Sequence, residues 1–443
     1  NVSYGCGRAE ILDGVGAALM SDIFHRNGIV TERALAVIEF DDGTAINVRA
    51  GKNLLRPAHF FRCLKQSDLE GLRQTVDYYV QRQVDNGEWP RLRASRDRYR
   101  YFLERIAVDF ARAAATFEME YIFCWLDWDG DNILTDGGII DYGSVRQFGL
   151  FHHEYRYDDT DRFSTTIPQQ RAKARYIAQC FAQIVDFLRT GTKQNVHRFR
   201  NSSALKLFDS IFEWTKDDVM LHKAGFTPAQ RELLLKDKVS ARQVRRFRET
   251  CRYFEKVKAR RGPYEVADGI TWDAVFCVRD ILRELPVYLH DNHLAAMTAA
   301  DFVGVLKSSY ADAIDLRINS RRAKRIAEFQ RLYLWLAQKV ADRTRKSTKH
   351  ILRGMRDRSA IINRYDRVTG DAIVKAAETL VLNFQNLSVN DLQQTMEDFV
   401  DAHVLMPNYK RRTNAANALK LRHVRKRIFD TMIKIVQTHR DGL

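Results

Sequence analysis

Five aspartates and one asparagine lie within one short stretch of the chain, residues 125–143, which reads WLDWDGDNILTDGGIIDYG. Two apolar pairs in it, Ile133-Leu134 and Ile139-Ile140, are typical of short strands. Asp136-Gly137-Gly138 lie between these pairs and supply the positive φ angles that a tight turn needs. We therefore predict a β-hairpin with polar residues at both of its ends.

The polar ends of this hairpin are candidates for binding a metal ion. Asn132 precedes the first strand and Asp141 follows the second, nine residues later. Mg²⁺ takes few protein ligands and fills its other positions with phosphate and water, so two oxygen ligands on a rigid hairpin suit Mg²⁺ (or Mn²⁺) bound to a nucleotide. Protein kinases bind their metals with a catalytic-loop Asn and the Asp of an Asp-Phe-Gly triplet. Here the triplet is Asp141-Tyr142-Gly143, and the stretch predicts a kinase-like site for ATP.

Asp127 is a candidate acid–base residue on spacing alone. It precedes Asn132 by five residues, which is the Asp-x-x-x-x-Asn spacing of kinases. In kinases this aspartate orients or deprotonates the acceptor hydroxyl. Transfer of the terminal phosphoryl group is therefore one hypothesis for this chain.

The same acids invite two other interpretations. Asp127, Asp129 and Asp131 match the first oxygen positions of a calcium-binding loop, but its sixth position is Asn132 instead of Gly and its twelfth is Gly138 instead of Glu. A solvated acidic turn is the second alternative. The apolar residues on both sides favour a turn held against a core, and therefore the metal–phosphate interpretation.

Two arginines, Arg49 and Arg56, lie seven residues apart in a basic segment. Guanidinium groups bind phosphate oxygens through paired hydrogen bonds, which suits a phosphate clamp. An exposed basic loop explains the segment equally well when it is considered alone.

The elements that would position these residues begin with a small α+β region. Apolar residues at helical spacing predict a helix over 11–24, with a stop at Asn27-Gly28. Residues 34–40 predict a strand of the buried type, 41–43 a turn and 44–49 a returning strand.

The remainder of the chain is predicted to be mainly helical. Helices are expected over 69–80 and 99–117 with a break at Asn86-Gly87, a loop over 150–168, and almost uninterrupted helices after Pro168. Breaks are expected near these residues: Gly191, Gly225–Pro228, Gly262-Pro263, Pro286, Gly354 and Pro407.

Composition limits the class of protein. The 443 residues are 45% hydrophobic with only 7 prolines, which favours a helical protein of two or three domains. The 6 cysteines are widely spaced and form no Cys-x-x-Cys pair, which is typical of a reduced compartment such as the cytoplasm or an organelle interior. The sequence contains no run of 18 apolar residues, so it predicts no membrane-spanning helix.

The formal net charge of +16 predicts acidic partners such as nucleotide phosphates or nucleic acid. Basic helices over 321–358 and 410–427 carry apolar residues at helical spacing, which a packed amphipathic helix with a solvated face explains. Nucleic-acid binding is therefore an alternative that the sequence does not favour.

Several segments together resemble the selenoprotein O family, in the same order along the chain. The residues that carry the resemblance are Gly7-Arg8-Ala9, 28–36, Arg49, Arg56, 123–132 and 140–143. The likeness covers roughly residues 1–190, and only general helicity agrees beyond. Members of this family are kinase-like proteins that bind ATP in a flipped orientation and transfer AMP to protein hydroxyls (of Ser, Thr or Tyr).

The resemblance implies a role for each matching residue. Asn132 and Asp141 would be the metal ligands, Asp131 the acid–base or orienting carboxylate, and Arg49 and Arg56 the clamp on the inverted phosphates. It also implies a bilobal kinase-like fold of the α+β class with a helical extension. We expect a partial N-lobe over 1–67, a helical C-lobe with the hairpin over 68–215, and a C-terminal helical domain over 216–443.

Three features depart from the family pattern. The nucleotide-binding lysine would fall before Asn1. The helix glutamate that pairs with it is expected near Ala17, where there is no acid, and Asp13 and Glu10 lie one and two turns before that position. The usual His-Gly is replaced by Trp125-Leu126. A degenerate pseudokinase that acts as a binding or scaffold protein is therefore the hypothesis that competes with an enzyme.

Overall fold

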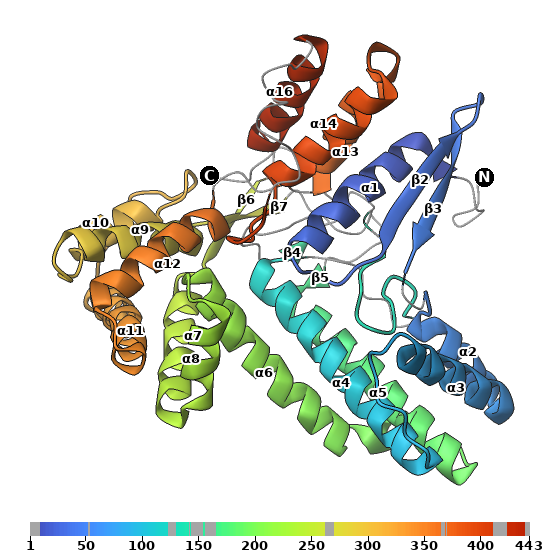
Figure 1. Cartoon of the computed structure of the whole chain (residues 1–443). Helices are drawn as coiled ribbons and strands as arrows, with labels where there is room; N and C mark the ends of the chain where they lie inside the picture. The colour runs from blue at the N-terminus through green and yellow to red at the C-terminus, as the bar shows by residue number, and fades with distance from the viewer. Residues whose placement is uncertain are drawn as a thin grey trace.

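The computed structural model describes residues 9–51, 54–122, 130–140, 142, 154–155, 165–261, 270–364, 368, 370–410 and 423–438. These residues are mostly helical and contain one three-stranded sheet and two two-stranded pairs (Figure 1). The chain is therefore a mixed α/β protein in which helices dominate.

The helices before the middle of the chain are α1 (Ile11–Arg26), α2 (Pro57–Gln66), α3 (Leu69–Asp85), α4 (Ser95–Glu120), α5 (Ile167–Thr190), the short η1 (Val196–Phe199) and α6 (Ser203–Lys223). Those after it are α7 (Pro228–Lys236), α8 (Lys238–Tyr253), α9 (Val278–Asp291), α10 (Ala299–Leu306), α11 (Ser320–Thr344), α12 (Thr348–Ile362), α13 (Gly370–Val381), η2 (Phe384–Asn386), α14 (Val389–Ala402) and α16 (His423–Thr438). The strands are β1 (Ala9–Glu10), β2 (Arg33–Glu39), β3 (Thr44–Ala50), β4 (Glu154–Tyr155), β5 (Thr165–Thr166), β6 (Val257–Arg261) and β7 (Ile270–Ala274).

The three-stranded sheet and α1 confirm the predicted N-terminal elements. The sheet is antiparallel in the order β1-β3-β2. The helix α1 ends at the predicted stop, since its cap is Asn27 and Gly28 has a φ of +75°. Gly14 allows α1 to approach the sheet closely, because a Cβ there would lie 2.1 Å from Asn47 Oδ1 and 2.6 Å from Val37 Cγ1.

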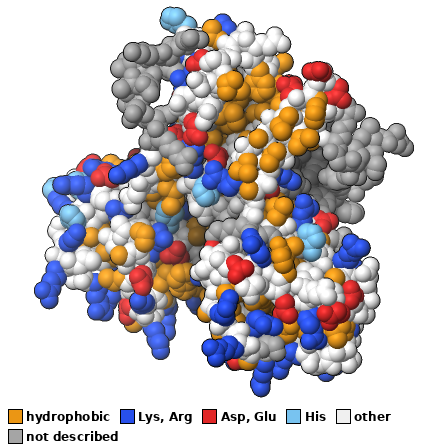
Figure 2. Space-filling model, turned by 45° about the vertical axis from the view of Figure 1, so that its right-hand side comes forward, with side chains coloured by type: hydrophobic (Ala, Val, Ile, Leu, Met, Phe, Trp, Pro, Cys, Tyr) orange, Lys and Arg blue, Asp and Glu red, His pale blue; other side chains and the backbone are white. Residues whose placement is uncertain are grey.

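The prediction of a buried strand over 34–40 is right about the strand and wrong about burial. Leu35 is 66% exposed, and Ile38 and Phe40 are about half exposed. Helix α1 covers the face of the sheet that carries Val37 and Asn47, whereas Ile38 pairs with Ile46 on the other face. Hydrophobic side chains gather on the upper part of the surface in Figure 2, and Lys and Arg are numerous on its lower part.

Two predicted helix breaks are wrong. Pro286 lies inside α9, and Gly354 lies inside α12. Proline lacks the N–H that would bond the carbonyl four residues earlier. In α9 that carbonyl, Leu282 O, accepts a hydrogen bond from Ser359 Oγ at 2.6 Å instead. Gly354 makes room for the guanidinium of Arg358, which would lie 3.0 Å from a Cβ at that position.

Other helix breaks were predicted correctly. The prediction of almost uninterrupted helices after Pro168 is wrong. Helix α5 ends at Thr190 before Gly191, and Gly225 separates α6 from α7. Between α8 and α9 the chain forms the antiparallel pair β6–β7, which the helical prediction missed. Within the predicted loop over 150–168, β4 and β5 form another short pair.

The described residues form two buried hydrophobic cores. The first joins α1 to α6 with residues of α13, α14 and α16, and the second extends from the end of α4 through α6 to α12. The last helices therefore lie beside α1 although they are distant from it in sequence (Figure 1). The domain boundaries expected at residues 67 and 215 stay predictions.

A buried arginine fixes α1 to α14. The Arg26 side chain is only 4% exposed and forms ion pairs with Asp22, Glu397 and Asp401, and a hydrogen bond of 3.0 Å to Tyr409 Oη. A buried guanidinium needs such partners, because an uncompensated charge in the interior is strongly destabilising. The C-terminal helices are thus held against the helix that supports the sheet.

Candidate functional site

The predicted hairpin is present as a tight turn. Ile133 and Ile139 form an antiparallel bridge, and Leu134 N donates to Gly138 O at 2.7 Å. Gly137 has the expected positive φ of +84°. The Asp136 carboxylate accepts from Gly138 N at 3.0 Å and closes the turn. Among the described residues the hairpin has a single bridge between its own two strands, so it depends on its neighbours to hold its shape.

Backbone contacts fix the hairpin between two distant segments. Leu55 O accepts hydrogen bonds from both Thr135 N, at 2.8 Å, and Thr135 Oγ1, at 2.7 Å. On the other side Ile139 N donates to Val30 O at 3.1 Å, and Thr31 Oγ1 donates to Ile139 O at 2.9 Å. The hairpin is thereby attached both to the entrance of β2 and to the segment that precedes α2.

The polar start of the hairpin packs against the beginning of α2. A Cβ at Gly130 would lie 2.5 Å from the Cβ of Pro57 and 3.4 Å from Ala58 N, and Gly130 has a φ of +69°. The exposed Asp131 and the half-buried Asn132 follow this contact directly. Arg56 is the residue before Pro57 and caps α2. The fold thus brings the Asp131-Asn132 pair to the chain segment of Arg56.

Arg49, at the end of β3, contacts the other end of the hairpin. Its Nη1 donates to Glu32 Oε1 at 2.8 Å and to Ile140 O at 3.1 Å, directly before Asp141 in the sequence. Glu32 is 1% exposed, so burial fixes its carboxylate and, through it, the guanidinium. The remaining N–H groups of the 35% exposed Arg49 side chain have no hydrogen bond to any described residue.

Glu32 is a site residue that sequence reasoning missed. It lies in the segment 28–36 that carries the family resemblance, but no role was predicted for it. The available signal was an acid immediately before an apolar strand, where burial requires a cationic partner.

A cavity of about 520 Å³ lies between α1, β3 and the end of the hairpin. Ala17, Asp13 and Arg49 line it, together with Ile140 and Tyr142. Ala17 lines this cavity and supplies no carboxylate there. Asp13 lies one turn away and pairs with the backbone N–H of Glu10.

Tyr142 belongs to the structural support of this cavity. Its hydroxyl forms a hydrogen bond with Thr31 Oγ1, and its ring packs near Phe24 with a centroid distance of 6.2 Å. Burial raises the pKa of the Tyr142 hydroxyl above its usual value, so this group stays protonated at neutral pH.

A second acid lies under the tip of the hairpin. A Cβ at Gly137 would lie 3.1 Å from Asp109 O, so the turn rests on α4. Burial raises the pKa of the Asp109 carboxyl to about 6, the nearby Asp136 carboxylate adds to the shift, and Arg105, 3.1 Å away, opposes it.

Two predicted site residues, Asp127 and Asp141, lie outside the described residues, as do Trp125 and Leu126. In the part of the chain that the structure describes, no group of three or more His, Cys, Asp or Glu side chains is gathered at one place. Asn132, one of the two predicted metal ligands, offers an amide oxygen of the kind that Mg²⁺ accepts and stands at the hairpin end beside α2. The donor chemistry therefore fits the predicted metal, with Asp141 needed to complete it.

Comparison with known proteins identifies the class of protein and then its family. The chain resembles proteins named protein nucleotidyltransferase YdiU. It is 25% identical to that of Nitrobacter hamburgensis over 210 residues (45% of this chain and 40% of the relative), and 26% identical to that of Azotobacter vinelandii over 242 residues (52% and 46%). The match with the Burkholderia lata protein is 28% over 189 residues (40% and 35%). The chain thus spans less than half the length of the curated relatives it matches.

The chain belongs to the family described as protein adenylyltransferase SelO, whose family model matches residues 3–364. This confirms the family resemblance. It also corrects the prediction that the likeness ends near residue 190, because the match extends through α12. No helix in the described part of the chain has the length and apolar character of a membrane span.

We predict that Gly130→Ala destabilises the chain more than Gly43→Ala does. Both glycines have a positive φ, so each substitution costs about 1–2 kcal/mol in backbone strain. A Cβ at Gly43 meets nothing within 4 Å, whereas one at Gly130 collides with Pro57, which adds about 1–3 kcal/mol. Thermal unfolding of the two variants measures the difference. Equal melting temperatures would show that the hairpin does not pack on α2.

We predict that Asp109→Asn changes the pH dependence of stability. Because burial raises the carboxyl pKa from 3.8 to about 6, the folded state holds this proton more tightly than the unfolded state. The stabilisation is complete below about pH 4 and is lost as the pH rises through 6, a change on the order of 2–3 kcal/mol. The melting temperature of the variant should therefore rise relative to wild type between pH 4 and 7.

The control for this measurement is Asp97→Asn, on the exposed first turn of the same helix. Its melting temperature should keep a nearly constant offset from wild type over the same pH range. An offset for Asp109→Asn that is also independent of pH would contradict the shifted pKa of the Asp109 carboxyl.

Proposed function

We propose that this chain transfers AMP from ATP to a hydroxyl group of a protein side chain (Ser, Thr or Tyr). Membership of a protein adenylyltransferase family supports the reaction class. The observation that supports the assignment is the attachment of the hairpin: Gly130 packs against Pro57 at the start of α2, directly after Arg56, while Ile140 O accepts a hydrogen bond from Arg49. One small element thus connects both arginines with the candidate metal ligands.

The proposed roles follow the chemistry of each group. Asn132 and Asp141 would bind Mg²⁺ or Mn²⁺, which supplies charge neutralisation for the phosphates. Arg49 and Arg56 would bind the phosphate oxygens through their guanidinium groups. The ion pair with the buried Glu32 would hold Arg49 in place before the nucleotide binds, so that little reorganisation is needed.

The proposed reaction is a nucleophilic substitution at the α-phosphorus of ATP. The acceptor hydroxyl oxygen forms a bond to this phosphorus, and the bond between the α-phosphorus and the bridging oxygen breaks to release pyrophosphate. The hydroxyl proton passes to a general base, for which Asp131 is the proposed residue because it is exposed beside Asn132. The arginines would stabilise the charge that develops on the phosphates.

Phosphoryl transfer with Asp127 as the base is the second candidate, because its spacing to Asn132 is that of kinases. In that case the hydroxyl attacks the γ-phosphorus and ADP leaves. A third candidate is a pseudokinase that binds partners without catalysis, which the alanine at position 17 favours. The proposed two-lobed, kinase-like arrangement is common to all three.

The test incubates the chain with ATP and Mg²⁺ and measures intact and peptide masses of the chain and of lysate proteins. We expect an AMP-sized addition that Asp141→Ala and Asp131→Ala abolish. A phosphate-sized addition that requires Asp127 would instead support phosphoryl transfer. No addition and no shift of the melting temperature by ATP would contradict both enzymatic proposals.

Arg56→Ala should lower the rate of transfer by about 10²–10³-fold, the usual effect of removing one group that stabilises developing charge. Arg62→Ala is the matched control, because Arg62 is exposed on the same helix, outside the candidate site. The control should retain the wild-type rate. Equal losses in the two variants would remove Arg56 from the phosphate site.

A further inference from the structure

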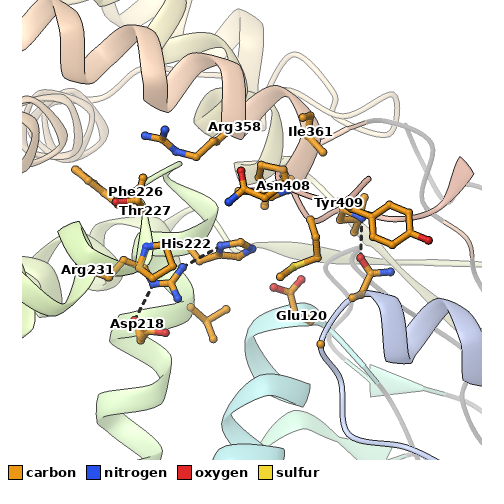
Figure 3. Close-up of a pocket in the computed structure, with 18 of the residues that line it drawn as sticks. Glu120, Asp218, His222, Phe226, Thr227, Arg231, Arg358, Ile361, Asn408 and Tyr409 are labelled. Atoms are coloured by element: carbon orange, nitrogen blue, oxygen red, sulfur yellow. Dashed lines mark hydrogen bonds and ion pairs between the residues drawn. The ribbon is translucent and has the colours of Figure 1, made fainter. Parts of the chain in front are cut away.

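A cavity of about 790 Å³ is lined by residues from α1, α4, α6, α7 and α12 and from the segment after α14 (Figure 3). Glu120 enters it from α4, His222 and Arg231 from α6 and α7, and Arg358 and Ile361 from α12. Its volume lies within the roughly 300–1,000 Å³ of sites for small organic ligands, which often occur at such junctions. None of Arg49, Arg56, Asp131 or Asn132 lines this cavity, so it is separate from the candidate nucleotide site.

Most charged groups that line the cavity are already paired. Arg231 Nε donates to Asp218 at 2.8 Å, and its Nη1 bonds His222 Nδ1 at 3.1 Å. The dashed lines in Figure 3 mark these contacts. Glu120 lies 3.5 Å from Lys223 Nζ, and Asp357 lies 2.8 Å from Arg356. The Arg26 guanidinium is held by the three carboxylates described above.

Arg358 is different, because its guanidinium has no ion pair with any residue that the structure describes. Its Nε donates to Gly225 O at 2.6 Å, and the absence of a side chain at Gly354 gives the terminal nitrogens their room. Burial lowers the pKa of Arg358, and the charges of Asp357 and Tyr333 oppose this shift. A partly desolvated cation of this kind is stabilised by an anion that enters the cavity.

The rest of the lining is largely apolar. Phe226 is buried, and Ile361 and Met406 are exposed by 38% and 39%. Ile361 comes from the same helix as Arg358, one turn further along, and Met406 comes from the segment after α14. A cavity lined by a flexible methionine as well as a rigid aromatic ring suits an apolar group of variable shape. The cavity therefore offers one uncompensated positive charge next to apolar walls.

We propose that this cavity binds a small organic anion that carries one negative group on an apolar body, such as an aromatic or branched carboxylate or sulfonate. Arg358 binds the anionic group, and Phe226, Ile361 and Met406 bind the apolar part. A multiply charged ligand is disfavoured, because the carboxylates of Glu120, Asp218 and Asp357 also line the space. Binding of such an anion depends on the residues of this cavity alone, and therefore does not depend on the proposed transfer of AMP.

The test titrates the chain with 8-anilinonaphthalene-1-sulfonate, an aromatic monoanion whose fluorescence reports binding. Arg358→Gln should weaken binding by about 10-fold to 100-fold, the effect of losing one charge-assisted hydrogen bond. Arg353→Gln is the matched control, because Arg353 is exposed on the same helix and does not line the cavity. It removes the same charge and should change the affinity less than twofold.

Arg358→Gln also removes the hydrogen bond to Gly225 O. If this loss unfolds the variant, a second variant still tests the proposal. Ile361→Asp alters a partly exposed position of the apolar wall and should also weaken binding at least 10-fold. Inorganic phosphate, which lacks the apolar part, should not displace the probe. Wild-type affinity in Ile361→Asp or Arg358→Gln, or displacement by phosphate at concentrations near those of the probe, would overturn the proposal.

Discussion

The attachment of the hairpin by a few hydrogen bonds is the constraint on which the candidate site depends. With a single bridge of its own, the turn at Asp136-Gly137 would not hold a fixed position in water. Leu55 O on one side and the Val30-Thr31 segment on the other supply the missing hydrogen bonds. The buried Ile133 and Ile139 side chains add the apolar contact that excludes water from these bonds.

Ion pairs connect the surroundings of the hairpin to the rest of the structure. Glu32 is buried and forms an ion pair with Arg49 of β3, and the same Arg49 nitrogen donates a hydrogen bond to Ile140 O of the hairpin. Arg26 connects the far end of α1 with Glu397 and Asp401 of α14, so the C-terminal helices brace the helix that supports the sheet. Such buried pairs are costly to break, because each would leave an uncompensated charge. The helix beside the candidate site is therefore held by an ion pair between residues 375 positions apart in the chain.

Much of the local structure was predictable from the sequence, and most of the long-range structure was not. The hairpin, α1 with its stop at Asn27, and the turn at Gly43 depend on glycine, capping and alternation, which are local signals. The burial of residues 34–40 depends on which face α1 covers, and the helix through Pro286 depends on Ser359, 73 residues later. Glu32 was missed for the same reason, since its partner Arg49 lies 17 residues later on another strand.

A crystal structure of the chain with Mg²⁺ and a non-hydrolysable ATP analogue tests the central claim most directly. The account predicts a metal ion about 2.1 Å from the side-chain oxygen of Asn132, with phosphate oxygens bound by Arg49 and Arg56. The hairpin should keep its bonds to Leu55 and Val30. A nucleotide bound elsewhere, with Asn132 remote from the metal, would contradict the assignment of this hairpin as the nucleotide site.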